Sequence, residues 1–300
     1  MNDKYAIELE GVSKSYDDFQ LKNINIKVPK GSIMGLIGEN GSGKSTTIKL
    51  ILNMVKCDEG KIKVFGKDCS DNPHLLMEDI GIVFDELYMS ETINPLAINK
   101  IMKNVYKNWD SNVFCEYLKR FNIPKKKKIR DLSKGTRMKL GIAIALSHKA
   151  KLLIFDEATA GLDPVVRDDI IDICMDFTKD EEHSILMSSH IVSDLEKACD
   201  YIAFLHNGEL IMCDEKDAIK DKYRIAKGSK EEIEHIDKSA IKGKKENAYG
   251  VYAMVETDSV PSTVHTENIT IEDLFIYTIR GQRVLREKDL DGQDILEEGE

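Results

Sequence analysis

A glycine-rich octapeptide constrains the fold of this chain more than any other feature of its sequence. Residues 38–45 read Gly-Glu-Asn-Gly-Ser-Gly-Lys-Ser, between the apolar run Ile33–Ile37 and the helical pattern of Lys44–Met54. A continuous apolar run is typical of a strand that is buried on both faces of a sheet. Glycines let successive backbone N–H groups curl around an anion, and the positive end of the following helix points at it. The sequence therefore predicts a phosphate-binding loop between a buried strand and a helix.

The side chains at the end of this loop match the pattern GxxxxGK[ST] in full, which gives each of them a specific role. Lys44 supplies a point charge for the β and γ phosphates of a nucleotide, and the Ser45 hydroxyl is a ligand for Mg²⁺. Thr46 is close enough in sequence to reach the α-phosphate. The expected nucleotide-binding residues of this segment are Gly38, Glu39, Asn40, Gly41, Ser42, Gly43, Lys44, Ser45 and Thr46.

A second chemical signal lies further along the chain, where an apolar segment ends in two acids. Leu152–Phe155 has the composition of a buried strand, and Asp156 and Glu157 follow it directly. Carboxylates at such a place are costly to desolvate unless they meet a cation or a reacting group. We expect Asp156 to bind Mg²⁺, and Glu157, on the opposite side of the strand, to act as the base for an attacking water. An ordinary strand end that enters a polar loop is the alternative interpretation.

The order of the predicted elements indicates the fold class. Strands and helices alternate through residues 152–205, which predicts an α/β fold with a parallel sheet covered on both faces. Near the start of the chain, Tyr5–Val12 and Asn23–Val28 alternate apolar and polar residues, as half-buried strands do.

The pattern weakens after about Lys222, which suggests a change of domain there. Ile271–Ile279 has the periodicity of an amphipathic helix, whereas residues 281–300 are rich in charge and poor in large apolar groups. We expect a main domain over residues 1–222, a small C-terminal accessory region over residues 223–280, and an acidic, mobile tail over residues 281–300.

Charge and hydropathy exclude two classes of direct partner. The net charge of −10 disfavours binding to a nucleic-acid backbone, which needs a basic surface, so we expect no nucleic-acid partner. No stretch of the sequence approaches the ~20 apolar residues that a membrane-spanning helix needs. If this protein works at a membrane, it does so through a partner.

A short motif before the acidic strand points to a known family. Residues 131–136, Asp-Leu-Ser-Lys-Gly-Thr, open a predicted helix and resemble the LSGGQ signature of the ATP-binding subunits of ABC transporters. Ser133 and Gly135 match the positions that hold the γ-phosphate of the opposite protomer's ATP, whereas Lys134 and Thr136 depart from the pattern. By itself, a serine at a helix N-terminus is already a sound site for an anion.

Three further segments resemble motifs of the same family and occur in the same order. Gly161-Leu162-Asp163-Pro164 resembles the D-loop, which lies across the dimer interface and implies a role for Asp163 at the nucleotide. His190 ends the segment Ser-Ser-His and matches the switch histidine, which senses the γ-phosphate. Tyr16, between the two early strands, matches the aromatic residue that stacks on adenine.

The segment after the predicted strand Ile80–Phe84 differs from the family pattern. Where the family usually has a glutamine that contacts magnesium and the attacking water, this chain has Asp85 followed by Glu86. A carboxylate can still bind Mg²⁺ or orient water, but it adds negative charge beside the phosphates. Because Asp85 occupies the position of this glutamine, we expect it to take part in catalysis and in metal binding.

The resemblance covers about residues 5–222 and implies a P-loop NTPase fold with a RecA-like parallel core. It further implies an antiparallel β subdomain and a helical insert over about residues 94–147, and we expect the region after them to be a small α+β extension. The implied activity is hydrolysis of ATP with Mg²⁺, coupled to transport. The implied partners are an integral membrane permease and a second ATP-binding subunit, identical or different, and the implied location is the cytoplasmic face of the membrane. The C-terminal segment, with Ile-Glu-Asp-Leu-Phe at residues 271–275, resembles the tail of the family's exporter branch.

Two other functions stay open at this point: a soluble ABC-type ATPase, for example in cluster assembly, and a regulatory ATP sensor. If the transporter function holds, apolar side chains of the helical insert and of the loop before it form a groove for a helix of the membrane subunit, with core packing as the alternative. These side chains are Leu87, Tyr88, Ile93, Ile98, Ile101, Met102, Val105 and Tyr106.

Overall fold

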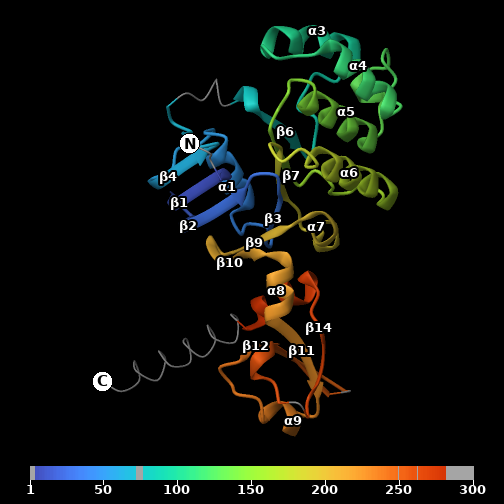
Figure 1. The fold of residues 1–300 in the computed structure, drawn as a ribbon. Helices are drawn as coiled ribbons and strands as arrows, with labels where there is room; N and C mark the ends of the chain where they lie inside the picture. Colours follow the sequence, from blue (N-terminus) through green and yellow to red (C-terminus); the bar gives the residue numbers. More distant parts are fainter. Residues whose placement is uncertain (1–3, 72–76, 249, 262, 282–300) are drawn as a thin grey trace. The chain divides into compact units, whose positions relative to one another are not determined.

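The computed structural model describes residues 4–71, 77–248, 250–261 and 263–281, and the chain forms two compact units (Figure 1). The first unit comprises Met1–Cys213 and the second Asp214–Glu300. This division, after residue 213, lies nine residues before the boundary that we expected after residue 222, so helix α8, Lys216–Lys222, belongs to the second unit. Apart from residue 281, the expected acidic tail lies outside the described residues.

The N-terminal part of the first unit is an antiparallel sheet with the strand order β2-β1-β4-β5. Burial alternates at Ile7 and Leu9 of β1 and at Ile24, Ile26 and Val28 of β2, which explains the alternation of apolar and polar residues in this part of the sequence. The strands are β1 (Tyr5–Tyr16), β2 (Phe19–Pro29), β4 (Glu59–Val64) and β5 (Lys67–Asp68).

The central sheet has the strand order β10-β9-β3-β8-β7-β6, and its strands from β9 to β6 are parallel. Every residue of β3 is buried, as its continuous apolar run predicted, and every residue of β8 is buried as well. The strands are β3 (Ile33–Ile37), β6 (Ile80–Phe84), β7 (Leu152–Asp156), β8 (Ser184–Ser188), β9 (Tyr201–His206) and β10 (Glu209–Glu215).

Helices accompany this sheet, and four helical segments form an insert between β6 and β7 with its own apolar cluster around Phe114, Leu118 and Leu140. Asn94 and Asp110 cap the first two helices of the insert through their side chains. The helices beside the sheet are α1 (Lys44–Ile51), α6 (Pro164–Phe177) and α7 (Val192–Ala198). Those of the insert are α3 (Pro95–Val105), α4 (Ser111–Arg120), the 3-10 helix η1 (Ile129–Asp131) and α5 (Lys134–Leu146). The expected fold class is confirmed.

The second unit is a small α+β structure with an antiparallel sheet in the order β12-β13-β11-β14. Its core includes Ala226, Ile233, Val251 and Ala253. Its elements after α8 are β11 (Tyr223–Gly228), α9 (Lys230–Glu234), β12 (Ile241–Asn247), β13 (Gly250–Glu256), the 3-10 helix η2 (Thr257–Ser259), β14 (His265–Asn268) and a helix over residues 271–281.

Among the residues that the structure describes, we find no helix with both the length and the apolar character needed to cross a bilayer.

Candidate functional site

The glycine-rich loop joins β3 to α1 and has the backbone geometry that its composition predicted. Gly41 and Gly43 have left-handed φ angles of 78° and 113°. A Cβ atom at Gly43 would lie 2.7 Å from the side chain of Leu21, so only glycine fits there, whereas the space beside Gly41 is open. No side chain of the described residues caps α1, and its first backbone N–H groups remain available to a ligand at this end of the helix.

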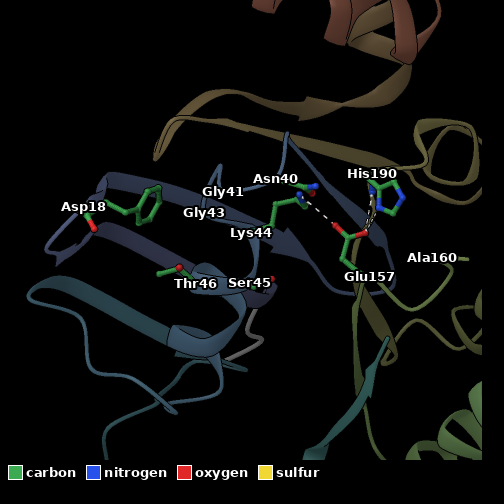
Figure 2. Close-up of a pocket in the computed structure, with 11 residues that line it drawn as sticks. Asp18, Asn40, Gly41, Gly43, Lys44, Ser45, Thr46, Glu157, Ala160 and His190 are labelled. Atoms are coloured by element: carbon green, nitrogen blue, oxygen red, sulfur yellow. Dashed lines mark hydrogen bonds and ion pairs between the residues drawn. The ribbon is translucent and has the colours of Figure 1, made fainter. Parts of the chain in front are cut away.

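Lys44 is held in place by backbone oxygen atoms and by one carboxylate. Its Nζ donates to the carbonyl oxygens of Gly38 at 2.8 Å and of Glu39 at 3.2 Å. The same Nζ lies 3.4 Å from Oε1 of Glu157, and the Lys44 side chain is only 5% exposed (Figure 2). A cation in this position is preorganised for a phosphate group. The hydroxyl of Ser42 in the same loop is buried and has no hydrogen-bond partner within the part of the chain that the structure describes.

The parallel sheet brings the two predicted acids to the phosphate loop. Asp156 ends β7 and pairs in register with Ser188 at the end of β8. Oδ1 of Asp156 accepts a hydrogen bond from Oγ of Ser188 at 2.8 Å and another from Oγ of Ser45 at 3.3 Å. A carboxylate beside a serine hydroxyl is a donor set that fits Mg²⁺, which prefers oxygen ligands. Ser188 is a residue that the sequence indicated only as the end of a strand.

Glu157 has an unusual backbone and is held from several sides. Its φ angle of 53° is left-handed, which costs of order 1–3 kcal/mol for a residue other than glycine. Its N–H lies 3.0 Å from Oγ of Ser188. Its Oε2 lies 2.6 Å from Nδ1 of His190 and accepts the backbone N–H of the same residue at 3.2 Å. The strained backbone directs the Glu157 carboxylate toward both Lys44 and His190 (Figure 2).

These groups surround a pocket of about 630 Å³ (Figure 2). Its lining residues are Asp18, Phe19, Asn40, Gly41, Gly43, Lys44, Ser45, Thr46, Glu157, Ala160 and His190. Tyr16 is 45% exposed and lies on an adjoining hollow that shares Asp18, Phe19 and Gly41 with the pocket. The sequence prediction missed Asp18 and Phe19, although their place in the turn after Tyr16 was a signal that could have identified them.

The signature residues lie outside this pocket. Oγ of Ser133 caps α5 by accepting the N–H of Thr136 at 3.2 Å, and Ser133 is exposed. Gly135 packs against Val166 of α6, since a Cβ there would come within 3.2 Å of that side chain. Asp163 caps α6 by accepting the N–H of Val166 at 3.0 Å. The structure therefore brings none of Ser133, Gly135 and Asp163 to the pocket of its own chain.

Asp85 also lies apart from the phosphate loop. It follows β6, which is the strand next to β7, and lines a second pocket of about 680 Å³ together with Tyr88, Lys134 and Arg137. The negative charge of Asp85 is the main cause that raises the pKa of the Tyr88 phenol. Asp85 is thus near the end of the sheet that carries Asp156, but it does not line the pocket around Lys44.

Comparisons with known proteins agree with these motifs. The family model described as "ABC transporter" matches residues 21–160. The ABC transporter ATP-binding protein YtrB of Bacillus subtilis is 33% identical over 219 residues, which are 72% of this chain and 74% of that protein. The lantibiotic transport ATP-binding protein SrtF of Streptococcus pyogenes is 32% identical over 214 residues, 70% of this chain and 91% of that protein.

Another relative and a solved structure extend this comparison. The bacitracin transport ATP-binding protein BcrA of Enterococcus faecalis is 31% identical over 211 residues, 69% of this chain and 68% of that protein. The structure of cbiO1 from Clostridium perfringens, part of the ABC transporter complex cbiONQ, superposes with a TM-score of 0.64 at 26% identity. The superposition covers 72% of this chain and 90% of the cbiO1 chain.

Proposed function

The chain belongs to the ABC transporter family as an ATP-binding subunit that hydrolyses ATP, and from this premise we propose that two copies enclose each ATP between them. One observation carries the proposal: the pocket around Lys44 lacks Ser133 and Gly135, which are the signature positions. Ser133 instead stands exposed at the start of α5, a position from which a partner's phosphate is accessible.

Within the pocket, the chain's own residues bind and orient the triphosphate. The uncapped N–H groups of α1 and the buried Nζ of Lys44 hold the β and γ phosphates. Ser45 and Asp156 are the residues that would hold Mg²⁺, which neutralises charge on the phosphate oxygens when it is bound. Thr46 and Asn40 line the pocket and are proposed to contact the phosphates. Tyr16, on the adjoining hollow, is proposed to contact adenine.

Glu157 orients the attacking water and accepts its proton in this mechanism. Its carboxylate lies between Lys44 and His190 at the mouth of the phosphate loop. Nδ1 of His190, 2.6 Å from Oε2, fixes the direction of that carboxylate. Positioning and charge stabilisation account for most of the catalysis in phosphoryl transfer. Ser133 and Gly135 of a second copy complete the site over the γ-phosphate, so that one chain supplies half of each of two sites.

The sharpest test of this arrangement uses Glu157→Gln, which keeps the shape of the side chain and removes the base. With MgATP this variant binds but does not hydrolyse, so we expect light scattering to show twice the mass of one chain. The double variant Glu157→Gln, Lys44→Met is the matched control and stays monomeric. If Glu157→Gln stays monomeric at saturating MgATP, ATP does not bridge two identical chains, and a different second subunit takes the place of the partner copy.

We also propose where the membrane subunit binds. Of the side chains expected to form a groove, Ile98 and Met102 are buried in the cluster of the insert and Tyr106 stacks on His148. Tyr88, in contrast, is 71% exposed and lies on the second pocket beside Arg137. A pocket that combines an exposed aromatic ring with charged side chains suits a short helix from another subunit. Ile101 and Val105 are exposed as well, on α3.

Two measurements test this part of the proposal. A pull-down of tagged Glu157→Gln from detergent-solubilised native membranes with MgATP is expected to recover a polytopic membrane protein in stoichiometric amount. Tyr88→Glu is expected to abolish transport while the ATPase activity of the purified protein without its membrane subunit stays within about twofold, since Tyr88 is absent from the nucleotide pocket. Unchanged transport by Tyr88→Glu counts against this surface.

We propose export as the direction of transport, because relatives are named for bacitracin and lantibiotic transport.

A further inference from the structure

Lys134 departs from the signature pattern of the family, and the structure gives its side chain a specific contact. Its Nζ donates a hydrogen bond of 2.7 Å to the backbone carbonyl oxygen of Ala160. Ala160 lines the nucleotide pocket and lies in the loop that leads from Glu157 to α6 (Figure 2). The side chain of Lys134 thus joins the start of α5, the signature helix, to the loop that follows Glu157 in the same chain.

The path from Lys134 to Glu157 is short. The N–H of Ala160 donates to the carbonyl oxygen of Glu157 at 3.0 Å, so Ala160 is bonded to Glu157 through its N–H and to Lys134 through its carbonyl oxygen. Gly161, with a φ angle of 68°, leaves room for the amine, because a Cβ atom there would lie 3.0 Å from Nζ. The backbone at Glu157 is itself left-handed, and such a conformation persists where the surroundings determine it.

Other contacts already hold the signature helix against α6. Gly135 packs on Val166, and Nζ of Lys139 pairs with Oδ2 of Asp169 at 2.6 Å. Lys139 lies on the same helix as Lys134 and binds α6 rather than the loop. Lys134 therefore contacts the loop after Glu157, whereas Lys139 contacts α6. Substituting each lysine in turn distinguishes an effect on the site from an effect on helix packing.

We propose that Lys134 is a positioning residue for Glu157 of its own chain. A charged donor holds the Ala160 carbonyl, the turn passes this restraint to Glu157, and the carboxylate keeps its place beside Lys44 and His190. Ser133, the adjacent residue, acts on the ATP of the other copy under the proposed function, on which this inference rests. One turn of the signature helix then serves two sites: Ser133 serves the partner's site and Lys134 serves its own.

The first test compares steady-state ATPase kinetics of the full chain with three substitutions. Lys134→Met removes the charge and keeps the length, and kcat is expected to fall about tenfold while KM changes less than twofold, since the lost hydrogen bond restrains Glu157 and leaves the phosphate loop intact. Lys139→Met is the matched control and is expected to keep kcat within about twofold. Lys134→Arg, which can still donate to the carbonyl, is expected to retain most of the activity. Equal losses from Lys134→Met and Lys139→Met overturn the proposal.

A second test assigns the effect to one chain of the pair. In mixed dimers one chain carries Glu157→Gln, so the site with the intact Glu157 does the hydrolysis. When Lys134→Met is in the chain with the intact Glu157, we expect the tenfold loss of activity. When Lys134→Met is in the chain that carries Glu157→Gln, we expect the activity of a mixed dimer with Lys134 in both chains. A loss that appears with Lys134→Met in the other chain shows action on the partner's site and contradicts the inference.

A third test needs no hydrolysis. Hydrogen exchange of residues 157–162 in separate chains without nucleotide reports how firmly this loop is held. Lys134→Met is expected to accelerate exchange in this segment several-fold, and Lys139→Met is expected to leave it unchanged. Unchanged exchange in Lys134→Met overturns the inference. If the wild-type chain does not hydrolyse ATP as a pair, the proposed function fails, whereas this measurement still decides the role of Lys134.

Discussion

Helices α1 and α5 both begin beside groups that suit a phosphate, but the two N-termini differ in how complete they are. The start of α1 is uncapped, and its Lys44 is buried among backbone carbonyls and Glu157. The start of α5 is capped by Ser133, whose hydroxyl accepts the N–H of Thr136, and it is exposed. The first is a site built within one chain, whereas the second is a surface that a ligand reaches only from outside.

This difference predicts two kinds of mutational effect. A change at the start of α1 acts on nucleotide binding by a single chain, because the pocket there is formed by residues of that chain. A change at Ser133, the cap of α5, leaves that binding intact and acts on the association of two chains. Variants that give the same defect at both helices would contradict the division.

The largest effect is expected for Lys44→Met. Removing a buried cation from the phosphate loop lowers kcat/KM by at least about 100-fold, since a preorganised charge is lost from the transition state. Binding of a fluorescent ATP analogue to the separate chain is expected to weaken as well. Lys49→Met, on the exposed side of α1, is the matched control and keeps both values. Normal ATP binding by Lys44→Met would place the nucleotide elsewhere.

Ser133→Asp and Ser133→Asn are expected to separate capping from phosphate binding. Both side chains cap helices well and have the same size, so the stability of α5 is retained in each. The aspartate adds a negative charge where the partner's phosphate is proposed to bind, and it is expected to lower kcat about 10- to 100-fold. The asparagine variant stays within about threefold of the wild type. Titration of a fluorescent ATP analogue into separate chains is expected to give equal affinities for both variants.

A smaller effect is expected for Asp85→Gln, which restores the residue usual in the family. Asp85 is exposed and lines the pocket of Tyr88 rather than that of Lys44. The change therefore alters kcat by less than about threefold, because water screens the charge. The pKa of Tyr88, measured by absorbance titration, is expected to fall toward its usual value when the neighbouring charge is removed. A large change in kcat would return Asp85 to the catalytic site.

The sequence predicted the central sheet well because buried strands leave continuous apolar runs, as in β3 and β7. It missed β10, Glu209–Glu215, which is half-buried at the sheet edge and mixes charged with apolar residues. It also missed β11 and β12, where lysines interrupt the pattern. The alternation of residues reports burial, and these strands are buried too little or too irregularly to produce a clear signal.

The local motifs of the site could be predicted from the sequence, whereas several of its contacts could not. Lys44 and Asp156 lie in motifs whose spacing carries the chemistry. The approach of His190 to Glu157 depends on the parallel register of β7 and β8, which brings together residues 33 positions apart. Spacing also placed Asp85 at the end of β6, but it carries no information on where the side chain lies. The hydrogen bond of Lys134 to Ala160 has no local sequence signal at all.

The smallest effect concerns the other end of α5, where His148 anchors the helix region to β6. Its ring nitrogens lie 3.1 Å from the carbonyl oxygen of Ile80 and 3.3 Å from that of Ile144, and its ring stacks on Tyr106 at 4.0 Å. Burial lowers the pKa of His148, although both carbonyls and the nearby Glu78 and Asp79 act in the opposite direction. The folded chain therefore keeps this imidazole neutral at a pH at which the unfolded chain binds a proton.

The sign of the pH dependence follows from this shift. Above the ordinary histidine pKa of about 6.5, both states are neutral at His148 and its contribution does not change with pH. As the pH falls below that value, the unfolded chain takes up a proton first, so the stability decreases until the folded-state pKa is reached. The melting temperature falls by roughly 2–4 °C for each kcal/mol lost in a domain of this size.

His148→Gln keeps a donor for the Ile80 carbonyl and removes the titration. Between pH 7.5 and 5.5, we expect its melting temperature to fall less than that of the wild type, even if the variant is less stable at every pH. Parallel curves for the two proteins would show that His148 does not titrate differently on folding. A smaller pH dependence for His148→Gln would show that His148 fixes the C-terminal end of α5 in the folded chain. If the Ser133 variants also bind the ATP analogue with equal affinity as separate chains, the N-terminal end of α5 is left available to a partner.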